Sequence, residues 1–198
     1  MIKRIPHLTL LLAFIFLSLL ANTSQLIFAE GKDNVKEACK VTRYQGLCVH
    51  SLAPFSNSAG RSPSKWARAG VSVTIAEVEN VQTYLANLNR HGSLRGRDKL
   101  ALLDCIELFA DALDELHSSL GVLRKLSRST FGTQMGDLNT WISAALTDED
   151  TCLDGFQGKK DRKIQLLQNR VLKVYYKTSN ALALVNKLST TALESNDP

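Results

Sequence analysis

The sequence predicts an all-α protein, an up-down-up-down four-helix bundle with an N-terminal helical hairpin. Three observations support this fold class. Only 7% of the 198 residues are aromatic while leucine, alanine and valine abound, which favours helices over strands. Apolar residues recur at spacings of three and four over long stretches, as they do in helices that form bundles. No run of useful length shows the apolar-polar alternation of a half-buried strand.

The length and composition indicate one globular domain behind a short leader. Hydrophobic residues make up 44% of the chain and charged residues 22%, which excludes a disordered tail or a fibrous repeat. The length leaves no room for a multidomain enzyme. We expect residues 1–29 to be a signal peptide, 30–60 the helical hairpin and 61–198 the bundle, with 30–198 forming one domain.

The N-terminal segment has the features of a secretion signal. Lys3 and Arg4 precede an apolar stretch at 8–20, which is too short to span a bilayer. Ala29 ends a plausible cleavage site, and Ala21 ends a less suitable one. An uncleaved membrane anchor is the alternative, but the pattern favours a soluble, secreted mature chain without a membrane span.

The hairpin and the first long helix follow the leader. We expect short helical pieces at 33–42 and 45–53, joined by a reversal at Tyr44-Gln45-Gly46 and extending beyond the bundle. Ser62 and Pro63 form a helix start signal, since serine caps a helix and proline suits its first position. An apolar stripe then predicts a helix over 63–90.

Three further amphipathic helices complete the predicted bundle. They span 97–127, about 135–158 and a C-terminal segment running from about 167 to 192. The clearest stripe, in 97–127, recurs at spacings of four and three and consists of Leu102, Ile106, Phe109, Leu113, Leu116, Leu120 and Leu123. Short breaks between the helices predict antiparallel neighbours.

Four cysteines follow the predicted signal, which indicates disulfides in an oxidising compartment. Three pairings are possible, and the local bridge Cys39–Cys48 closes most easily across the reversal between them. That leaves Cys105–Cys152. Cys105 lies early in one predicted helix and Cys152 late in the next, and antiparallel packing places those two ends side by side. Closing this loop stabilises the fold by roughly 4 kcal/mol in the chain-entropy model.

No pattern for catalysis, metal binding or cofactor binding emerges. The chain lacks a nucleophile elbow, a zinc-protease motif, a phosphate loop and a dinucleotide fingerprint. The four histidines are scattered, and no Cys-x-x-Cys occurs, so we expect no zinc site. The stretch Asp150 to Gly155 resembles the start of a calcium loop, but Cys152 takes a ligand position and Asp161 replaces the required Glu. We expect no enzyme, no cofactor and no metal.

The charge balance argues against nucleic-acid binding. The formal net charge falls from +5 to +3 when Lys3 and Arg4 are removed with the signal, since residues 1–29 contain no acid. Basic residues cluster mostly near predicted helix ends, where cations are favoured or simply solvated. No aromatic platform is interleaved with them.

Acidic residues gather in two stretches without lysine or arginine. The first comprises Asp104, Glu107, Asp111, Asp114 and Glu115, and the second comprises Asp148, Glu149, Asp150 and Asp154. The Cys105–Cys152 bridge would bring both to one corner, so that nine of the 19 carboxylates share a surface. This pattern indicates a docking surface for a positively charged partner. The alternative is a solvated face, with Thr147 or Asp148 capping a turn.

Several motifs carry a family resemblance. They are Ala38-Cys39-Lys40-Val41-Thr42 leading to Cys48, Asp104-Cys105-Ile106-Glu107-Leu108, Thr140-Trp141-Ile142-Ser143-Ala144-Ala145-Leu146-Thr147, Thr151-Cys152-Leu153-Asp154-Gly155-Phe156 and Thr178-Ser179-Asn180-Ala181-Leu182-Ala183. With them, essentially all of 30–198 resembles the plant invertase/pectin methylesterase inhibitor family. One departure is Gln45, which stands where the family usually has proline and should loosen the first turn without removing the bridge.

The resemblance implies a fold, a location and a role. It implies a four-helix bundle with a helical hairpin, secretion to the cell wall (the apoplast), and the bridges Cys39–Cys48 and Cys105–Cys152. It also implies a non-catalytic inhibitor that forms a 1:1 complex and covers the substrate cleft of its target. The motifs at 140–147 and 150–156 are similar to those of inhibitors of pectin methylesterase. The invertase-directed branch often carries a Pro-Lys-Phe tripeptide, which this chain lacks.

The resemblance also implies which residues contact the partner. At the matching positions they are Glu107, Asp111, Asp114, Thr151 and Asp154, all within the acidic stretches. Inhibition of cell-wall or vacuolar invertase is the main alternative function. A detached pro-region of a pectin methylesterase precursor is less expected, because no catalytic domain follows Pro198. A hollow bundle carrying a lipid would need smaller residues than these leucine-rich stripes.

Overall fold

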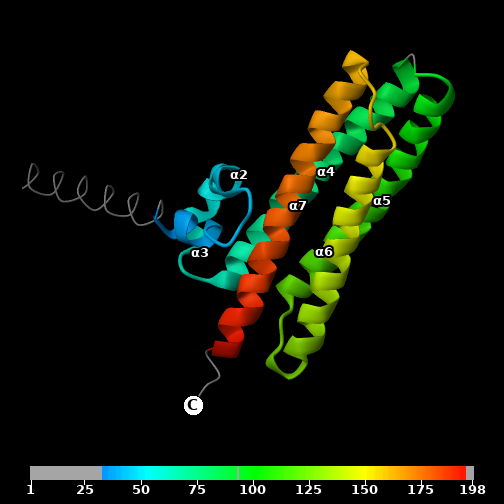
Figure 1. The fold of residues 1–198 in the computed structure, drawn as a ribbon. Helices are drawn as coiled ribbons and strands as arrows, with labels where there is room; N and C mark the ends of the chain where they lie inside the picture. The colour runs from blue at the N-terminus through cyan, green and yellow to red at the C-terminus, as the bar shows by residue number, and fades with distance from the viewer. Residues whose placement is uncertain (1–32, 93, 195–198) are drawn as a thin grey trace, which may run out of the picture.

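The computed structural model describes residues 33–92 and 94–194, and nearly all of them are helical (Figure 1). The predicted all-α bundle is confirmed, and no strand occurs in the described ranges. Its long helices are α4 (Pro63–His91), α5 (Gly96–Arg124), α6 (Phe131–Asp154) and α7 (Arg162–Glu194). The predicted signal, 1–29, lies outside the described residues. Among those described, no helix has the length and apolarity needed to cross a membrane.

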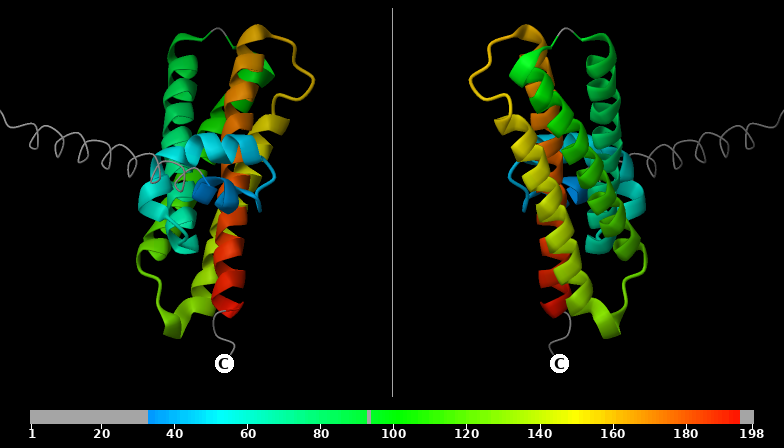
Figure 2. Two further views of the ribbon diagram at one scale, coloured as in Figure 1. Left: turned by 90° about the vertical axis from the view of Figure 1, so that its left-hand side faces the viewer. Right: turned by 90° about the vertical axis from the view of Figure 1, so that its right-hand side faces the viewer.

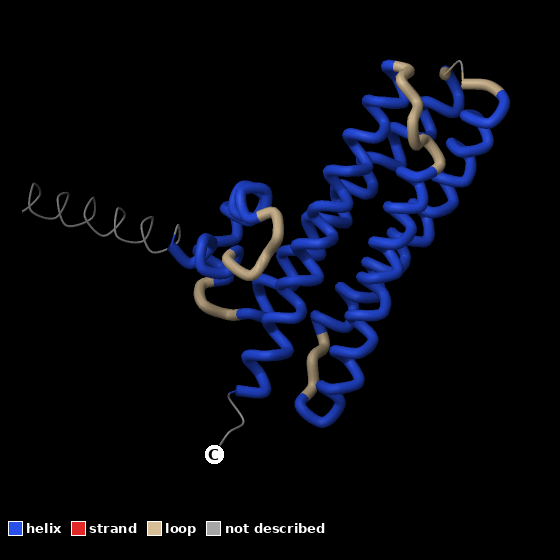
Figure 3. The backbone as a smooth tube through the Cα atoms, viewed as in Figure 1, coloured by secondary structure: helices blue, strands red, loops and turns tan. Residues whose placement is uncertain are grey.

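The four helices surround one core, and each packs against two others. α4 and α6 both pack against α5 and against α7. The bundle therefore has two opposite sides, one formed by α4 and α7 and the other by α5 and α6. In Figure 2 the left view faces the first side and the right view faces the second. Short loops join consecutive helices (Figure 3), as the sequence predicted.

The N-terminal hairpin packs beside the bundle, whereas we expected it to extend beyond it. It consists of a helical stretch at 33–39, α2 (Gln45–Leu52), η1 (Ala53–Phe55) and α3 (Ser56–Ala59), and α2 contacts both α4 and α7. The Asn180 side chain on α7 explains this position. It accepts a hydrogen bond from the Tyr44 N–H at 3.1 Å and donates one to the Tyr44 carbonyl at 3.0 Å.

Both predicted disulfides are present. Cys39 bonds to Cys48 with a Cα–Cα distance of 5.8 Å, so the bridge forms although Gln45 begins α2. Cys105 bonds to Cys152 with a Cα–Cα distance of 4.7 Å, which confirms that α5 and α6 are antiparallel neighbours.

The sequence predicts some helix ends correctly and others only approximately. Ser62 caps α4 by accepting the Lys65 N–H at 3.4 Å, as predicted. α6 begins at Phe131 and ends at Asp154, about four residues earlier at each end than we expected. Gly158, which has a φ of +74°, lies in the turn that follows α6. A positive φ is a conformation that helices do not contain, so α6 cannot reach 158.

Large side chains fill the bundle core. The largest of those less than 2% exposed include Phe109, Leu116, Leu138, Ile142 and Leu167. α4 and α7 approach each other closely at Gly70, where an added Cβ would lie 3.0 Å from Leu184 Cδ1. A core of this kind does not favour the hollow ligand-carrying bundle.

Candidate functional site

The outer face of α5 carries four exposed carboxylates in one line, namely Asp104, Glu107, Asp111 and Asp114. Their spacings of three, four and three keep them on one side of the helix. The other side buries Cys105, Phe109 and Leu116 in the core. The predicted outward position of these acids is therefore confirmed.

The end of α6 presents the other predicted contact residues. Thr151 and Asp154 are both exposed, as is Asp150. The Thr151 hydroxyl donates to the Thr147 carbonyl at 2.7 Å, which leaves its oxygen able to accept a hydrogen bond from outside. Asp154 is the last residue of α6, so its side chain lies at the rim of this face.

Covalent and ionic links hold α5 and the end of α6 together. The Cys105–Cys152 bridge lies between Asp104 and Glu107 on one helix and beside Thr151 on the other. Lys159, just after α6, pairs with Asp98 of α5 at 2.7 Å. We call the outer surface of the two helices, with Glu107, Asp111, Asp114, Thr151 and Asp154, the acidic face. The structure places these five on adjacent helices, and their role in binding stays a prediction.

The carboxyl groups of the two helices act on one another. Burial raises the pKa of Glu115 to about 7, and the negative charges of Asp148 and Asp111 add to this effect. Burial also raises the pKa of Asp148, again reinforced by Asp111. The negative charge of Asp111 on α5 therefore affects the pKa of Asp148 on α6, as expected if the two acidic stretches lie side by side.

Glu149 does not belong to this surface, which corrects the prediction of nine surface carboxylates. Its side chain is fully buried and accepts a hydrogen bond from the Thr178 hydroxyl of α7 at 2.6 Å. Burial raises the pKa of Glu149 to about 8; the Thr178 bond opposes this, and Asp148 and Glu115 reinforce it. The reason is helical register, because Glu149 follows the inward line of Ile142 and Ala145.

The capping alternative for Thr147 and Asp148 is also wrong. Both residues lie in the interior of α6, far from its first turn. Neither can therefore act as the N-cap of a helix.

Two exposed leucines extend the acidic line of α5, and we did not predict them. Leu100 is 61% exposed and Leu103 is 39% exposed. Each lies four residues before an acid of the line, Asp104 or Glu107. The signal was present in the sequence, since neither leucine fits the buried stripe. An exposed apolar pair beside charged groups is typical of a protein-interaction surface.

The described ranges contain no group of three or more histidine, cysteine, aspartate or glutamate side chains arranged to hold a metal ion. The acidic face thus offers carboxylates, one hydroxyl and apolar contact area. Such a set can bind another protein through charge and shape.

Comparison with known proteins identifies the family. A family model described as Plant invertase/pectin methylesterase inhibitor matches residues 33–184. The chain belongs to the plant invertase/pectin methylesterase inhibitor family. All five predicted contact residues and all four cysteines fall within the matched range.

Individual members of the inhibitor family are similar over most of their length. Pectinesterase inhibitor 6 of Arabidopsis thaliana is 44% identical over 170 residues, which cover 85% of this chain and 81% of that protein. Pectinesterase inhibitor 3 of the same plant is 37% identical, with 81% of each covered.

A solved structure shows the same fold. The crystal structure of mutant form A of a pectin methylesterase inhibitor from Arabidopsis superposes with a TM-score of 0.60 at 22% identity. The match covers 75% of this chain and 92% of that one.

Proposed function

We propose that this chain is a secreted inhibitor of pectin methylesterase that is not itself an enzyme. The observation that carries the proposal is the 44% identity to Pectinesterase inhibitor 6 over most of both chains. The invertase-directed alternative is less favoured, because the two similar relatives reported above are both named pectinesterase inhibitors.

The proposed mechanism is occlusion of the enzyme's substrate cleft by the acidic face in a 1:1 complex. α5 contains 29 residues, so the face is about 40 Å long, and two helices side by side make it about 20 Å wide. That area, roughly 800 Å², equals one partner's share of a standard stable interface. The cross-link between Cys105 and Cys152 supports this mechanism, since a rigid surface loses little entropy on binding.

The chemistry of the face suggests how it would bind. Exposed carboxylates of α5 would pair with basic groups at the rim of the cleft, which sets orientation and association rate. Leu100 and Leu103 would supply apolar contact, which drives most of the free energy of protein association.

The leader and the disulfides support secretion to the cell wall. The charged and apolar pattern of residues 1–29 is that of a signal peptide. Two disulfides with no free cysteine among the described residues suit an oxidising extracellular compartment.

A purified-protein assay against both enzymes tests the proposed function. We expect increasing amounts of the mature chain to lower pectin methylesterase activity and to leave cell-wall and vacuolar invertase unaffected. Inhibition of invertase alone would establish the alternative, and inhibition of neither enzyme would refute both.

A further inference from the structure

The charges of this protein divide between the two sides of the bundle. Within the bounds of α4 and α7 there are nine lysines and arginines but three aspartates and glutamates. Within α5 and α6 there are three basic residues and eleven acidic ones. Because these pairs form opposite sides, the molecule is strongly dipolar although its net charge is small.

A basic line runs along α7 where it meets α4. Its members are Arg170, Lys173 and Lys177, spaced by three and four residues and therefore on one side of the helix. We call these three residues the basic stripe. Arg170 lies over the Tyr84 ring of α4, with its guanidinium carbon 4.5 Å from the ring centroid, and within the described residues no carboxylate pairs with it.

One carboxylate faces two lysines in the stripe, so positive charge remains in excess. Lys173 and Lys177 lie 3.1 Å and 2.5 Å from the oxygens of Glu77 on α4. Burial alone raises the pKa of Glu77, yet the two lysines bring it below its usual value. Glu77 is therefore ionised and neutralises the equivalent of one lysine, which leaves the other lysine and Arg170 to attract an anion.

A groove of mixed polar and apolar lining and aromatic rings border the stripe. The groove has a volume of about 320 Å³ between α2, α4 and α7. Its polar lining includes His50, Glu77, Asn80, Lys173 and Lys177, and apolar side chains of α2 and α4 complete it. Nearby on α7, Tyr176 stacks on Tyr44 with ring centroids 3.9 Å apart. The exposed Arg43 extends the basic surface over Tyr44, 5.7 Å from the ring centroid. Cations, hydrogen-bonding groups and flat apolar rings together suit a sugar polymer that carries carboxylates.

We propose that the basic stripe and its groove bind de-esterified pectin, a polymer of uronic acid. This inference rests on the proposed function, since the enzyme that the chain would inhibit converts neutral methyl esters into carboxylates. The stripe lies opposite the acidic face, so the polymer and the enzyme can be bound at the same time. The inhibitor would thereby be held where de-esterification has already occurred.

Binding to immobilised polygalacturonate at about 0.05 M salt tests the proposal without any enzyme present. We expect the mature chain to bind polygalacturonate and to dissociate as the salt concentration rises to about 0.3 M, because salt screens the charges. It should not bind fully methyl-esterified pectin. Absence of binding to polygalacturonate would overturn the proposal. So would binding to anionic phospholipid vesicles in its place, because the partner would then be a membrane.

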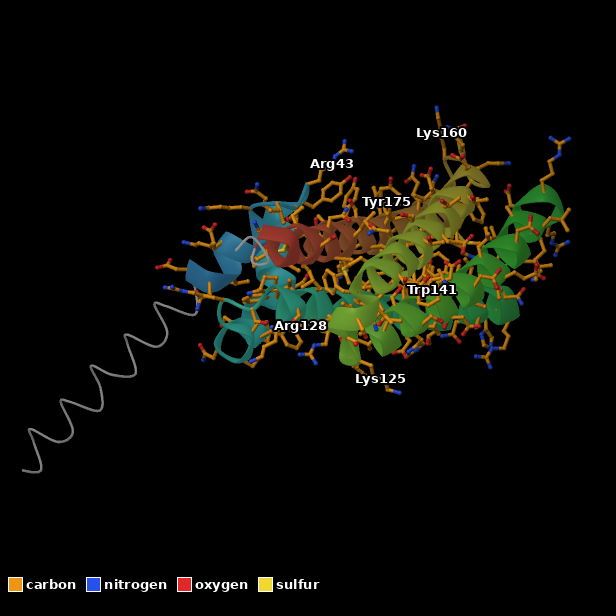
Figure 4. The ribbon with its side chains drawn as sticks, turned by 90° about the horizontal axis from the view of Figure 1, so that it is seen from below. Arg43, Lys125, Arg128, Trp141, Lys160 and Tyr175 are labelled. Carbon is orange, nitrogen blue, oxygen red and sulfur yellow. A yellow bond between two sulfur atoms is a disulfide. The ribbon has the colours of Figure 1, made fainter. Side chains whose placement is uncertain are left out.

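Matched variants locate the surface. Arg170→Gln with Lys173→Gln should weaken binding about three- to tenfold, and it leaves Lys177 to pair with Glu77. The control, Lys125→Gln with Arg128→Gln, removes the same charge from the α5–α6 connection, which lies on the opposite side of Figure 4 from Arg43 and Tyr175. An equal loss in the control would show that only net charge matters, which contradicts a defined stripe.

A third variant should strengthen binding. Glu77→Gln removes the carboxylate that opposes the two lysines, so we expect binding about two- to threefold tighter. Unchanged or weaker binding by a folded Glu77→Gln protein would count against the stripe. Pectin methylesterase inhibition is measured separately on each variant. Normal polymer binding without inhibition would refute the proposed function alone, and inhibition without polymer binding would refute this inference alone.

Discussion

Glu149 holds a carboxyl group in the core between α6 and α7. One of its oxygens accepts the Thr178 hydroxyl, and the other has no hydrogen-bond partner. Burial, with the nearby charges of Asp148 and Glu115, raises its pKa to about 8 against the bond from Thr178. In the unfolded chain this group ionises near its ordinary pKa of 4.5. The free energy of unfolding should therefore fall as pH rises from about 4.5 to about 8.

Replacing Glu149 with glutamine should remove most of that loss. Glutamine has the shape of the protonated acid and still accepts from Thr178, so Glu149→Gln should resemble the wild type at pH 4.5. At pH 8 it should be more stable, by on the order of 3 kcal/mol. Thermal unfolding at both pH values measures the difference. Glu79→Gln, an exposed site on α4, is the control and should change nothing. Equal destabilisation of Glu149→Gln at both pH values would show that glutamine does not fit.

Substitution of Asp111 and Asp114 tests whether the acidic face binds the enzyme. Both are exposed and bury no partner, so Asp111→Ala with Asp114→Ala should weaken pectin methylesterase inhibition at least about tenfold. Helicity and the thermal midpoint should stay nearly unchanged, because Asp111 only adds repulsion to Glu115 and Asp148. Glu79→Ala should inhibit like the wild type. If the double variant instead lost its fold and kept its inhibition per folded molecule, the residues would have a structural role.

For single residues, the sequence predicts which side of a helix a side chain faces better than it predicts what surrounds that side chain. The spacing of Asp104, Glu107 and Asp111 opposite a leucine stripe was enough to show that they face water. The same reasoning failed for Glu149. It was grouped with the neighbouring acids in the sequence, although it lies on the side of α6 that faces the core. The exposure of Leu100 was missed although Leu100 lies off the buried stripe, because an apolar residue near a helix start is ordinarily assigned to the core.

The α5–α6 pair depends on its disulfide. The bridge between Cys105 and Cys152 spans 47 residues and the Cys39–Cys48 bridge spans nine. In the chain-entropy model the longer loop stabilises the fold by about 4 kcal/mol and the shorter by about 2.5 kcal/mol.

Removing each bridge separately should distinguish their roles. Cys105→Ala with Cys152→Ala should lower the free energy of unfolding more than Cys39→Ala with Cys48→Ala, as measured by urea denaturation. The first pair should also weaken pectin methylesterase inhibition, since the two halves of the acidic face would no longer be fixed. The second pair should leave inhibition intact. Equal inhibition by both variants would mean that the bridge does not organise the contact surface.

The four long helices could be predicted because apolar residues recur in each of them at spacings of three and four. Helix ends were predictable only where a local signal exists, as at Ser62 and Pro63. The position of the hairpin was not, because it depends on Asn180, which is 136 residues from Tyr44 and meets it only in the folded chain.

The whole molecule should respond to the pH of its surroundings. A carboxylate of the acidic face that comes to lie against acids of the enzyme, and not beside a basic group of the rim, would have a raised pKa in the complex, so its protonation would favour binding. Glu115, with its pKa already raised to about 7, loses its charge within the same range. We therefore expect the affinity for pectin methylesterase to be higher at pH 5 than at pH 8. Equal or tighter binding at pH 8 would contradict this interpretation.

The division of charge between the two sides was not predictable from runs of residues alone. The acidic stretches are continuous in the sequence and were recognised there. The basic side combines residues of α4, α7 and the hairpin that are far apart in the chain. Only the packing of α4 against α7 reveals that Glu77 meets Lys173 and Lys177.

Carboxylate footprinting of the complex identifies which side of the bundle the enzyme covers. The chain is treated with a carbodiimide and an amine, alone and with pectin methylesterase, and the labelled residues are mapped by mass spectrometry. We predict that Glu107, Asp111, Asp114 and Asp154 become protected, while Asp33 and Glu79 on the other side are labelled as before. Protection of Asp33 and Glu79 with full labelling of the α5 acids would contradict occlusion by the acidic face, because the enzyme would then bind the opposite side of the bundle.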